Sequence, residues 1–221
     1  MLKREVIATK DGSKTLFIPE WNENYHSHHG ALQEALHVFI KNGLDEVVKP
    51  EINILEIGFG TGLNAILTLK HVLKSTKNVF YEAIEKYPLA QEEVRSLDYA
   101  KCFSAELQKA FEELHQSTWE KPTEIVKSFI LFKRQLDLKA FQSKNMFDLI
   151  YFDAFGPRIQ PKMWKKEIFS VLFDHLNNEG KLVTYCAKGQ VRRDMESVGF
   201  NVEKLPGPPG KREMLRATKV N

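Results

Sequence analysis

The sequence feature that most constrains the fold is a run of three glycines at alternate positions, Gly58, Gly60 and Gly62. An apolar, β-branched segment over residues 52–57 precedes them and predicts a buried strand, and an amphipathic segment over residues 63–73 predicts a helix. A strand, a glycine turn and a helix open a nucleotide-binding βαβ unit, in which bare backbone and helix-start N–H groups approach the ligand. The sequence therefore predicts an α/β domain that binds a nucleotide.

The spacing of these glycines indicates which nucleotide is bound. A dinucleotide fingerprint, G-x-G-x-x-G, would need its third glycine at position 63, where the chain has Leu63. The sequence instead reads E-x-G-x-G-x-G from Glu56, the form seen in S-adenosylmethionine (SAM) methyltransferases. A glycine turn that binds nothing is the alternative. The residues expected to contact the cofactor here are Glu56, Gly58, Phe59, Gly60, Gly62 and Asn64.

An acid about 20 residues beyond the first strand is expected to bind the ribose hydroxyls of the cofactor. Residues 78–84 form an apolar, aromatic segment that predicts the next strand, and Glu85 follows it directly. Glu85 is therefore the expected ribose-binding residue, with Lys86 beside it as a further cofactor contact. Glu82 is the competing acid, but it lies within the strand and is expected to face solvent or an ion pair.

A second stretch with chemical potential begins with a strand predicted over residues 147–152 and ends in Asp153. Ligands in open α/β sheets bind beyond the carboxyl ends of the strands, which places Asp153 in the expected crevice. Asp153, Phe155 and Pro157 would suit a planar substrate that carries an amine, with Asp153 as the catalytic residue. The alternative is that Asp153 only caps the turn that follows it.

The C-terminal part of the chain is basic. Between Lys188 and Lys219 there are eight Lys or Arg residues against four Asp or Glu residues, although the net charge of the whole chain is only +3. Such a segment beside a crevice could contact phosphates, and a solvated surface explains the charge equally well. The candidate phosphate-binding residues are Arg192, Arg193, Lys211 and Arg212.

Composition argues against several other classes of protein. The cysteines, Cys102 and Cys186, stand in no ligand spacing, which indicates no zinc site and a reduced, cytoplasmic setting. The N-terminus has no apolar signal segment, and no apolar run approaches the ~18 residues of a membrane span. His26, His28 and His29 could suggest a metal, but no second cluster completes a site. We therefore expect surface histidines, no metal and no membrane.

Residues 1–48 are expected to form an extension that packs on the core and covers the site, with a hairpin over residues 6–18 and a helix over residues 31–40. Residues 49–221 should form the nucleotide-binding domain, interrupted by a helical insertion over residues 100–123 that could border the substrate. A mostly parallel, seven-stranded sheet is expected. Its other strands lie at residues 129–132, 181–186, 200–205 and 213–218, with helices starting at 86–89 and spanning 163–176 and 189–198, and a turn at 177–180.

Together these stretches resemble the methyltransferase domain of the tRNA-modifying MnmC family, whose stand-alone form is called MnmD. The match runs from about Asp11 to Ala217. It rests on residues 58–64, 85–89, 153–157, 163–164, 191–193, 199–200 and 211–215.

The resemblance implies a class I SAM-dependent methyltransferase fold of Rossmann-like type. It implies methyl transfer to the exocyclic amine of 5-aminomethyl-2-thiouridine at the tRNA wobble position, giving 5-methylaminomethyl-2-thiouridine. It also implies that Tyr25 and Ser27 lie near the substrate, and that other enzymes supply the amine. FAD is expected to be absent, because in bifunctional relatives it belongs to a second domain.

The resemblance is incomplete at the adenine end. Family members often carry a Gly-Asp pair after the third strand, where the acid meets adenine. Lys133 and Arg134 stand there in this chain, and Asp137 comes three residues late. Residues 188–190 also differ from the Gly-Phe often seen before Val-Arg-Arg. The adenine contact is therefore left open.

The expected chemistry needs a proton acceptor. An alkyl amine has a pKa near that of lysine, about 10.4, and so arrives protonated and without a lone pair. The Asp153 carboxylate can take the proton or orient the amine, although its charge alone favours the ammonium form. Two other functions stay open: a SAM methyltransferase acting on a small-molecule or protein amine, and a non-catalytic nucleotide-binding or RNA-binding module.

Overall fold

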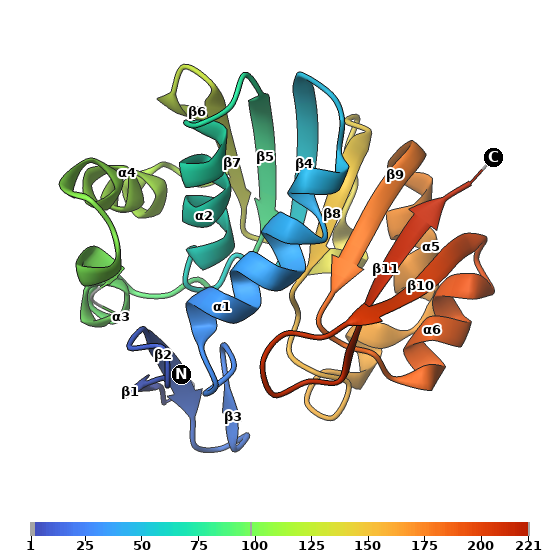
Figure 1. The fold of residues 1–221 in the computed structure, drawn as a ribbon, viewed down its shortest axis with the longest axis horizontal. Coiled ribbons are helices and arrows are strands. Elements are labelled where there is room, and N and C mark those ends of the chain that lie inside the picture. Colours follow the sequence, from blue (N-terminus) through green and yellow to red (C-terminus); the bar gives the residue numbers. More distant parts are fainter. Residues whose placement is uncertain (1–2, 98, 221) are drawn as a thin grey trace.

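The computed structural model describes residues 3–97 and 99–220, and a twisted eight-stranded sheet forms its centre (Figure 1). The strand order is β10-β11-β9-β8-β4-β5-β7-β6, which is the predicted mostly parallel α/β architecture. The parallel strands are β4 (Glu51–Ile57), β5 (Asn78–Ile84), β7 (Phe129–Arg134), β8 (Phe147–Phe152) and β9 (Leu176–Thr184). The antiparallel pairings bring in β6 (Thr123–Val126), β10 (Phe200–Pro206) and β11 (Glu213–Lys219). The strand beyond the expected seven is β6, which follows the insertion and pairs with β7 at one edge.

Helices cover both faces of this sheet and bury two apolar cores (Figure 1). Alternate residues of one strand serve the two cores, so that Ile54 of β4 faces one and Leu55 faces the other. The first core is covered by α1 (Ala31–Ala35), α2 (Leu63–Val72), α3 (Gln91–Ser96) and α4 (Ala105–Gln116). The second is covered by α5 (Lys166–Asp174) and α6 (Gly189–Glu196). Short 3₁₀ helices span Leu44–Glu46, Tyr99–Cys102, Leu138–Ala140 and Pro161–Trp164.

A separate three-stranded sheet precedes the core and includes the predicted hairpin. Its strands are β1 (Glu5–Ala8), β2 (Lys14–Ile18) and β3 (Glu23–Asn24). Gly12 has φ +83° in the hairpin turn, as an Asp-Gly turn requires. α1 continues as a π-helix over Leu36–Lys41, which changes the side-chain register. Leu36, at the start of this π-helix, is exposed, while Val38 is buried.

Two predicted boundaries were wrong for local reasons. The helix expected to start at residues 86–89 begins at Gln91, because the Glu93 side chain accepts the Ala90 N–H at 2.8 Å and caps the helix there. The turn expected at residues 177–180 belongs to β9 as an irregularity, in which Glu179 has φ +62°.

Gly58 lies where the ends of three parallel strands meet. The N–H groups of Gly58 and Phe59 donate to the Ile84 carbonyl at 2.9 and 3.2 Å, and the Asp153 N–H donates to the Ile57 carbonyl at 3.0 Å. Gly58 has φ +92°, and a Cβ at this position would lie 2.8 Å from the Asp153 carbonyl oxygen. Only glycine therefore lets β4 and β8 end this close together.

We expect Gly58→Ala to lower the free energy of unfolding by about 2 kcal/mol or more, since left-handed backbone costs ~1–2 kcal/mol and the backbone clash adds to it. The melting temperature should fall by about 4–8 °C for a chain of this size. Gly156→Ala is the matched control, because a Cβ there would meet only the Tyr185 hydroxyl, at 3.7 Å. Equal melting temperatures for the two variants would contradict the close approach.

Candidate functional site

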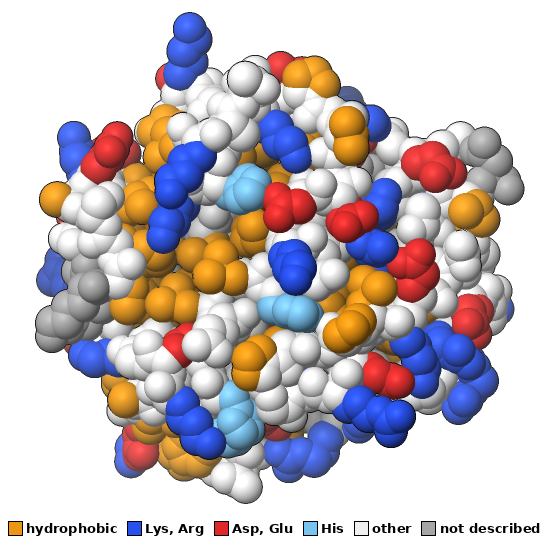
Figure 2. Space-filling model, viewed as in Figure 1, with side chains coloured by type: hydrophobic (Ala, Val, Ile, Leu, Met, Phe, Trp, Pro, Cys, Tyr) orange, Lys and Arg blue, Asp and Glu red, His pale blue; other side chains and the backbone are white. Residues whose placement is uncertain are grey.

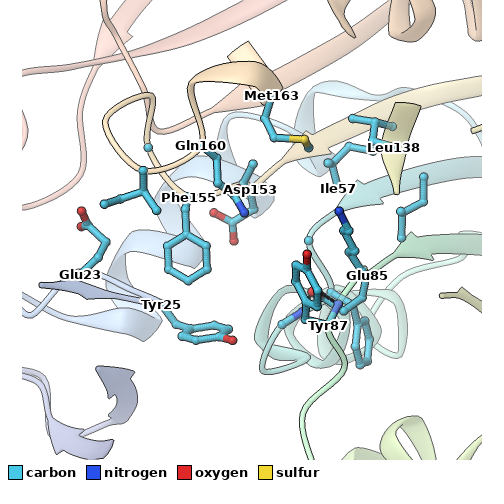
Figure 3. A pocket seen from close by; sticks show the side chains of 18 of the residues that line it. Glu23, Tyr25, Ile57, Glu85, Tyr87, Leu138, Asp153, Phe155, Gln160 and Met163 are labelled. Atoms are coloured by element: carbon cyan, nitrogen blue, oxygen red, sulfur yellow. Dashed lines mark hydrogen bonds between the residues drawn. The ribbon is translucent and has the colours of Figure 1, made fainter. Parts of the chain in front are cut away.

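A cavity of about 540 Å³ lies beyond the carboxyl ends of β4, β5, β7 and β8, where the topology predicts a ligand (Figure 3). Loops after these strands form its floor, and residues of the N-terminal sheet form its opposite wall. Figure 3 shows Asp153 and Glu85 on different sides of the cavity, with Tyr25 and Phe155 near Asp153. The predicted site residues that line it are Tyr25, Gly58, Phe59, Gly60, Asn64, Glu85, Lys86, Asp153 and Phe155.

The glycine turn and Glu85 hold each other in place. The Gly60 N–H donates to Glu85 Oε2 at 3.0 Å, and the Tyr87 N–H donates to Glu85 Oε1 at 2.8 Å. Each carboxylate oxygen keeps a further lone pair for a hydroxyl donor. Gly60 has φ +48°, and a Cβ on it would lie 3.3 Å from the Tyr25 ring. Backbone, carboxylate and aromatic ring thus form a narrow cradle.

Glu82, the competing acid, has a structural role. Its side chain is fully buried and accepts a hydrogen bond from Arg134 Nη1 at 3.1 Å, and Asn145 Nδ2 lies 3.3 Å from its second oxygen. The ion pair was one of its two expected environments, and exposure to solvent was not found. Glu82 is not part of the cavity wall.

Residues after β7, the segment for which the sequence left the adenine contact open, line the cavity. Asp137 lines the cavity and accepts a hydrogen bond from Lys86 Nζ at 2.9 Å, and Leu138 lies beside it. Lys133 is 1% exposed and donates to the His115 carbonyl at 2.9 Å, so it does not reach the cavity. Burial lowers the pKa of Lys133 to about 8. The late acid thus occupies the cavity wall in place of the usual one.

Asn64 connects two carboxyl groups at the floor of the site. Its Nδ2 donates to Glu56 Oε1 at 2.9 Å and to Asp153 Oδ2 at 2.8 Å. Burial raises the pKa of Asp153 to about 7; the Asn64 hydrogen bond and the charge of Lys211 act in the opposite direction, and the charge of Glu34 adds to the rise. Asp153 therefore titrates near neutrality, as a general base at this pH should.

Glu56 does not lie in the cavity wall, contrary to its expected role as a cofactor contact. Its side chain is 0% exposed and points beneath the glycine turn towards Asn64. Burial is the main cause that raises its pKa well above the usual value, and the charge of Asp153 adds to this. Burial therefore favours the protonated form of Glu56.

Aromatic residues close the cavity beside Asp153. The Trp21 and Tyr25 rings pack edge-to-face on Phe155, with centroids 5.3 and 5.0 Å apart. Burial raises the pKa of Tyr25 to about 12, so its hydroxyl stays protonated. Trp21 was not predicted; its only signal was an aromatic residue in the stretch that also holds Tyr25.

His26 was expected on the surface and lies in the cavity wall instead. Its Nε2 is 2.7 Å from Thr61 Oγ1, and burial lowers its pKa to about 4, so the ring is neutral. Ser27 does not reach the cavity; its N–H donates to Glu34 Oε1 at 3.1 Å and its hydroxyl accepts the His29 N–H at 3.2 Å.

The helical insertion was expected to border the substrate. It supports the glycine turn from behind instead and does not line the cavity. His115 of α4 donates from Nε2 to the Thr61 carbonyl at 3.1 Å. A Cβ on Gly62, which has φ +71°, would lie 2.7 Å from the same nitrogen. Gly62, expected to contact the cofactor, therefore packs on the insertion and does not line the cavity.

A second, open groove of about 530 Å³ adjoins the cavity, since Gly156 and Tyr185 line both. The predicted residues Pro157, Lys211 and Arg212 line this groove, together with Arg158 and Lys188.

The cations of the groove differ in how far they are already paired. Lys211 forms an ion pair with Glu34 and lies 3.8 Å above the Tyr185 ring, and Arg158 pairs with Glu23 at 2.8 Å. Within residues 3–97 and 99–220, the Lys188 and Arg212 side chains make no ion pair or hydrogen bond.

Arg192 and Arg193 lie on α6, outside both the cavity and the groove. Arg192 lies 3.6 Å from Glu196, and Arg193 donates to Gln190 at 2.9 Å. Figure 2 shows further Lys and Arg side chains over the C-terminal part of the molecule, interspersed with acidic ones.

Across the described ranges, no group of three or more His, Cys, Asp or Glu residues could hold a metal ion. In the same part of the chain, no helix has the length and apolar character needed to cross a membrane.

Comparisons with known proteins agree with this geometry. The MnmC protein of Campylobacter fetus, named as a bifunctional protein of tRNA 5-methylaminomethyl-2-thiouridine biosynthesis, is 30% identical over 216 residues, which cover 92% of this chain and 34% of that protein. The protein of the same name from Cupriavidus metallidurans is 31% identical over 232 residues, covering 96% and 33%. The chain thus spans about a third of the length of these relatives.

The crystal structure of MNMC2 from Aquifex aeolicus is similar, with a TM-score of 0.79 and 25% identity, over 100% of this chain and 72% of that one. A protein family described as S-adenosyl-L-methionine-dependent methyltransferase matches residues 100–220. Because that match covers more than half of the chain, and the strand order and cavity agree with it, the chain belongs to this family of SAM-dependent methyltransferases.

Proposed function

We propose that the protein transfers the methyl group of SAM to the exocyclic amine of 5-aminomethyl-2-thiouridine at the wobble position of tRNA, giving 5-methylaminomethyl-2-thiouridine. The observation that carries this proposal is the position of Asp153, which faces the same cavity as the glycine turn and lies beside an aromatic wall. The names of the relatives supply the substrate. The reaction would take place in the cytoplasm, after other enzymes have produced the amine.

The cavity residues fit SAM. The absence of a side chain at Gly60 leaves the space that a Cβ would fill, and both Glu85 oxygens can accept hydrogen bonds from the ribose hydroxyls. Asp137 can accept a hydrogen bond from the adenine amino group, and Leu138 can pack against the adenine ring. Phe59, which also lines the cavity, would contact the cofactor near the turn. The proposed reaction is not a redox reaction and uses neither FAD nor a metal.

When bound, SAM supplies a methyl group on a sulfonium, which a neutral amine accepts as its C–N bond forms and the S–C bond breaks. The chain's part is to make that amine neutral. Asp153 takes a proton from the ammonium group, whose own pKa the apolar wall lowers. Phe155 and Tyr25 hold the base so that its amine faces Asp153, since an unstacked anticodon base stacks on aromatic rings.

The first test is Asp153→Asn, which keeps the shape but cannot take a proton. We expect SAM binding measured by calorimetry to be retained, and the single-turnover rate with undermodified tRNA to fall by about 10²–10⁴-fold. In the parent protein the rate should rise with pH through about 7, because the ionised Asp153 is the active form and its pKa is about 7. The variant should lose this rise.

Asp174→Asn is the matched control, since Asp174 is an exposed residue at the end of α5. Mass spectrometry of the digested tRNA should show the methylated nucleoside with the parent protein and with this control. A near-normal rate for Asp153→Asn would remove Asp153 as the base. Methylation of small-molecule or protein amines without methylation of tRNA would remove the proposed substrate.

We further propose that the groove beside Pro157 holds the tRNA backbone, because Lys188 and Arg212 offer unpaired charges next to the cavity. Phosphate contacts add affinity that falls with salt and carries little base information. Lys211 is a poor probe of this interaction, since its removal would leave the Glu34 carboxylate buried without its partner.

We expect the double variant Lys188→Ala/Arg212→Ala to weaken binding to all tRNAs alike and to reduce the salt slope of log K by about 1 to 2, measured by fluorescence anisotropy. Turnover at saturating tRNA should change little. Lys121→Ala/Lys127→Ala is the control, because it removes the same charge from exposed positions around β6, at the other edge of the sheet. Equal affinities and slopes for the two double variants would show that the groove is only a solvated surface.

A further inference from the structure

Glu56 is an acid inside the protein that no step of the proposed reaction uses. It lies in β4, one residue before the strand ends, and its side chain is 0% exposed. It is absent from the residues that line the cavity, whereas its partner Asn64 is among them. Burying a carboxyl group is costly unless it makes hydrogen bonds, so its position calls for an explanation.

The explanation lies in Asn64, whose amide joins Glu56 to Asp153. Asn64 is at the start of α2 and 2% exposed, and its Nδ2 is 2.9 Å from Glu56 Oε1 and 2.8 Å from Asp153 Oδ2. An amide that meets carboxyl oxygens on both sides has one favourable orientation, with the NH₂ towards them. Without Glu56, the amide would have a single partner and could rotate.

We propose that Glu56 is a positioning residue that acts through Asn64, fixing the amide so that it holds the Asp153 carboxylate towards the substrate amine. This inference rests on the proposed function, in which Asp153 accepts the proton. It replaces the direct cofactor contact expected for Glu56 from the glycine motif. Glu56 Oε1 acts only as an acceptor for the amide.

Charge supports this division of roles. Two carboxylates on one amide would repel each other if both were ionised, and deeper burial disfavours the charged form more strongly. Burial raises the pKa of Glu56 well above the usual value, whereas Asp153 titrates near 7. The titratable groups that interact with Asp153 are Glu34, Lys211 and Tyr185, and those that interact with Glu56 are Tyr81, Glu85 and Tyr151.

The experiment compares Glu56→Met, which removes the acceptor, with Glu56→Gln, which keeps a neutral acceptor of the same shape. For Glu56→Met we expect kcat to fall by about 10–100-fold, as for other residues that orient an active group, with KM for SAM changed by less than about twofold. The rise of the rate with pH should move to higher pH, because an N–H aimed at Asp153 favours its ionised form and this hydrogen bond is weakened. Glu56→Gln should restore both kcat and the pH profile.

Several outcomes would overturn the inference. A Glu56→Gln variant that loses SAM affinity with kcat unchanged would show that Glu56 acts as an anion on the cofactor. A folded Glu56→Met variant with parental kcat and pH profile would show that Asn64 needs no second partner. If the melting curve shows that Glu56→Met does not fold, Glu56→Gln alone tests the inference. Parental kcat and SAM affinity in Glu56→Gln support it, and a loss of either contradicts it. A different result, an Asp153→Asn variant with near-normal activity, would contradict the proposed role of Asp153 in the reaction.

Discussion

The close approach of the β4 and β8 ends is the constraint on which the site depends. The Asp153 carbonyl lies where any side chain at position 58 would have to be. This approach places the glycine turn and the Asp153 carboxylate side by side at the floor of the cavity. The N–H groups of Gly58 and Phe59 donate to the Ile84 carbonyl and so hold the end of β5 against them. One missing side chain therefore sets how close the glycine turn lies to the Asp153 carboxylate.

Hydrogen bonds between polar groups support the floor of the cavity from behind. Asn64 joins two carboxyl groups below the turn, and His115 and Lys133 link the insertion to the turn from the other side. Lys133, at the end of β7, donates to the His115 carbonyl and so supports α4, and it does not line the cavity. The acid that reaches the cavity wall here is Asp137, three residues further along the chain.

Much of this arrangement could be predicted from local sequence patterns. The buried strands and the glycine turn follow from the periodicity of apolar residues and from spacing, so Gly58, Glu85 and Asp153 were placed in the correct part of the fold. Long-range packing could not be predicted in this way. Nothing local indicates that His26 turns into the cavity or that Glu56 points away from it, since both depend on segments distant in sequence.

The N-terminal sheet is fastened to the rest of the chain near both of its ends. Tyr25 lies against Gly60, and Arg4 lies 5.9 Å from the Tyr25 ring while pairing with Glu93 at 3.0 Å. Arg158 fastens the other end of this sheet to the loop after β8, through Glu23. The cavity wall formed by this sheet is thus held by contacts that join sequence-distant segments. Its position relative to the glycine turn depends on two ion pairs, Arg4–Glu93 and Arg158–Glu23, one near each end of the sheet.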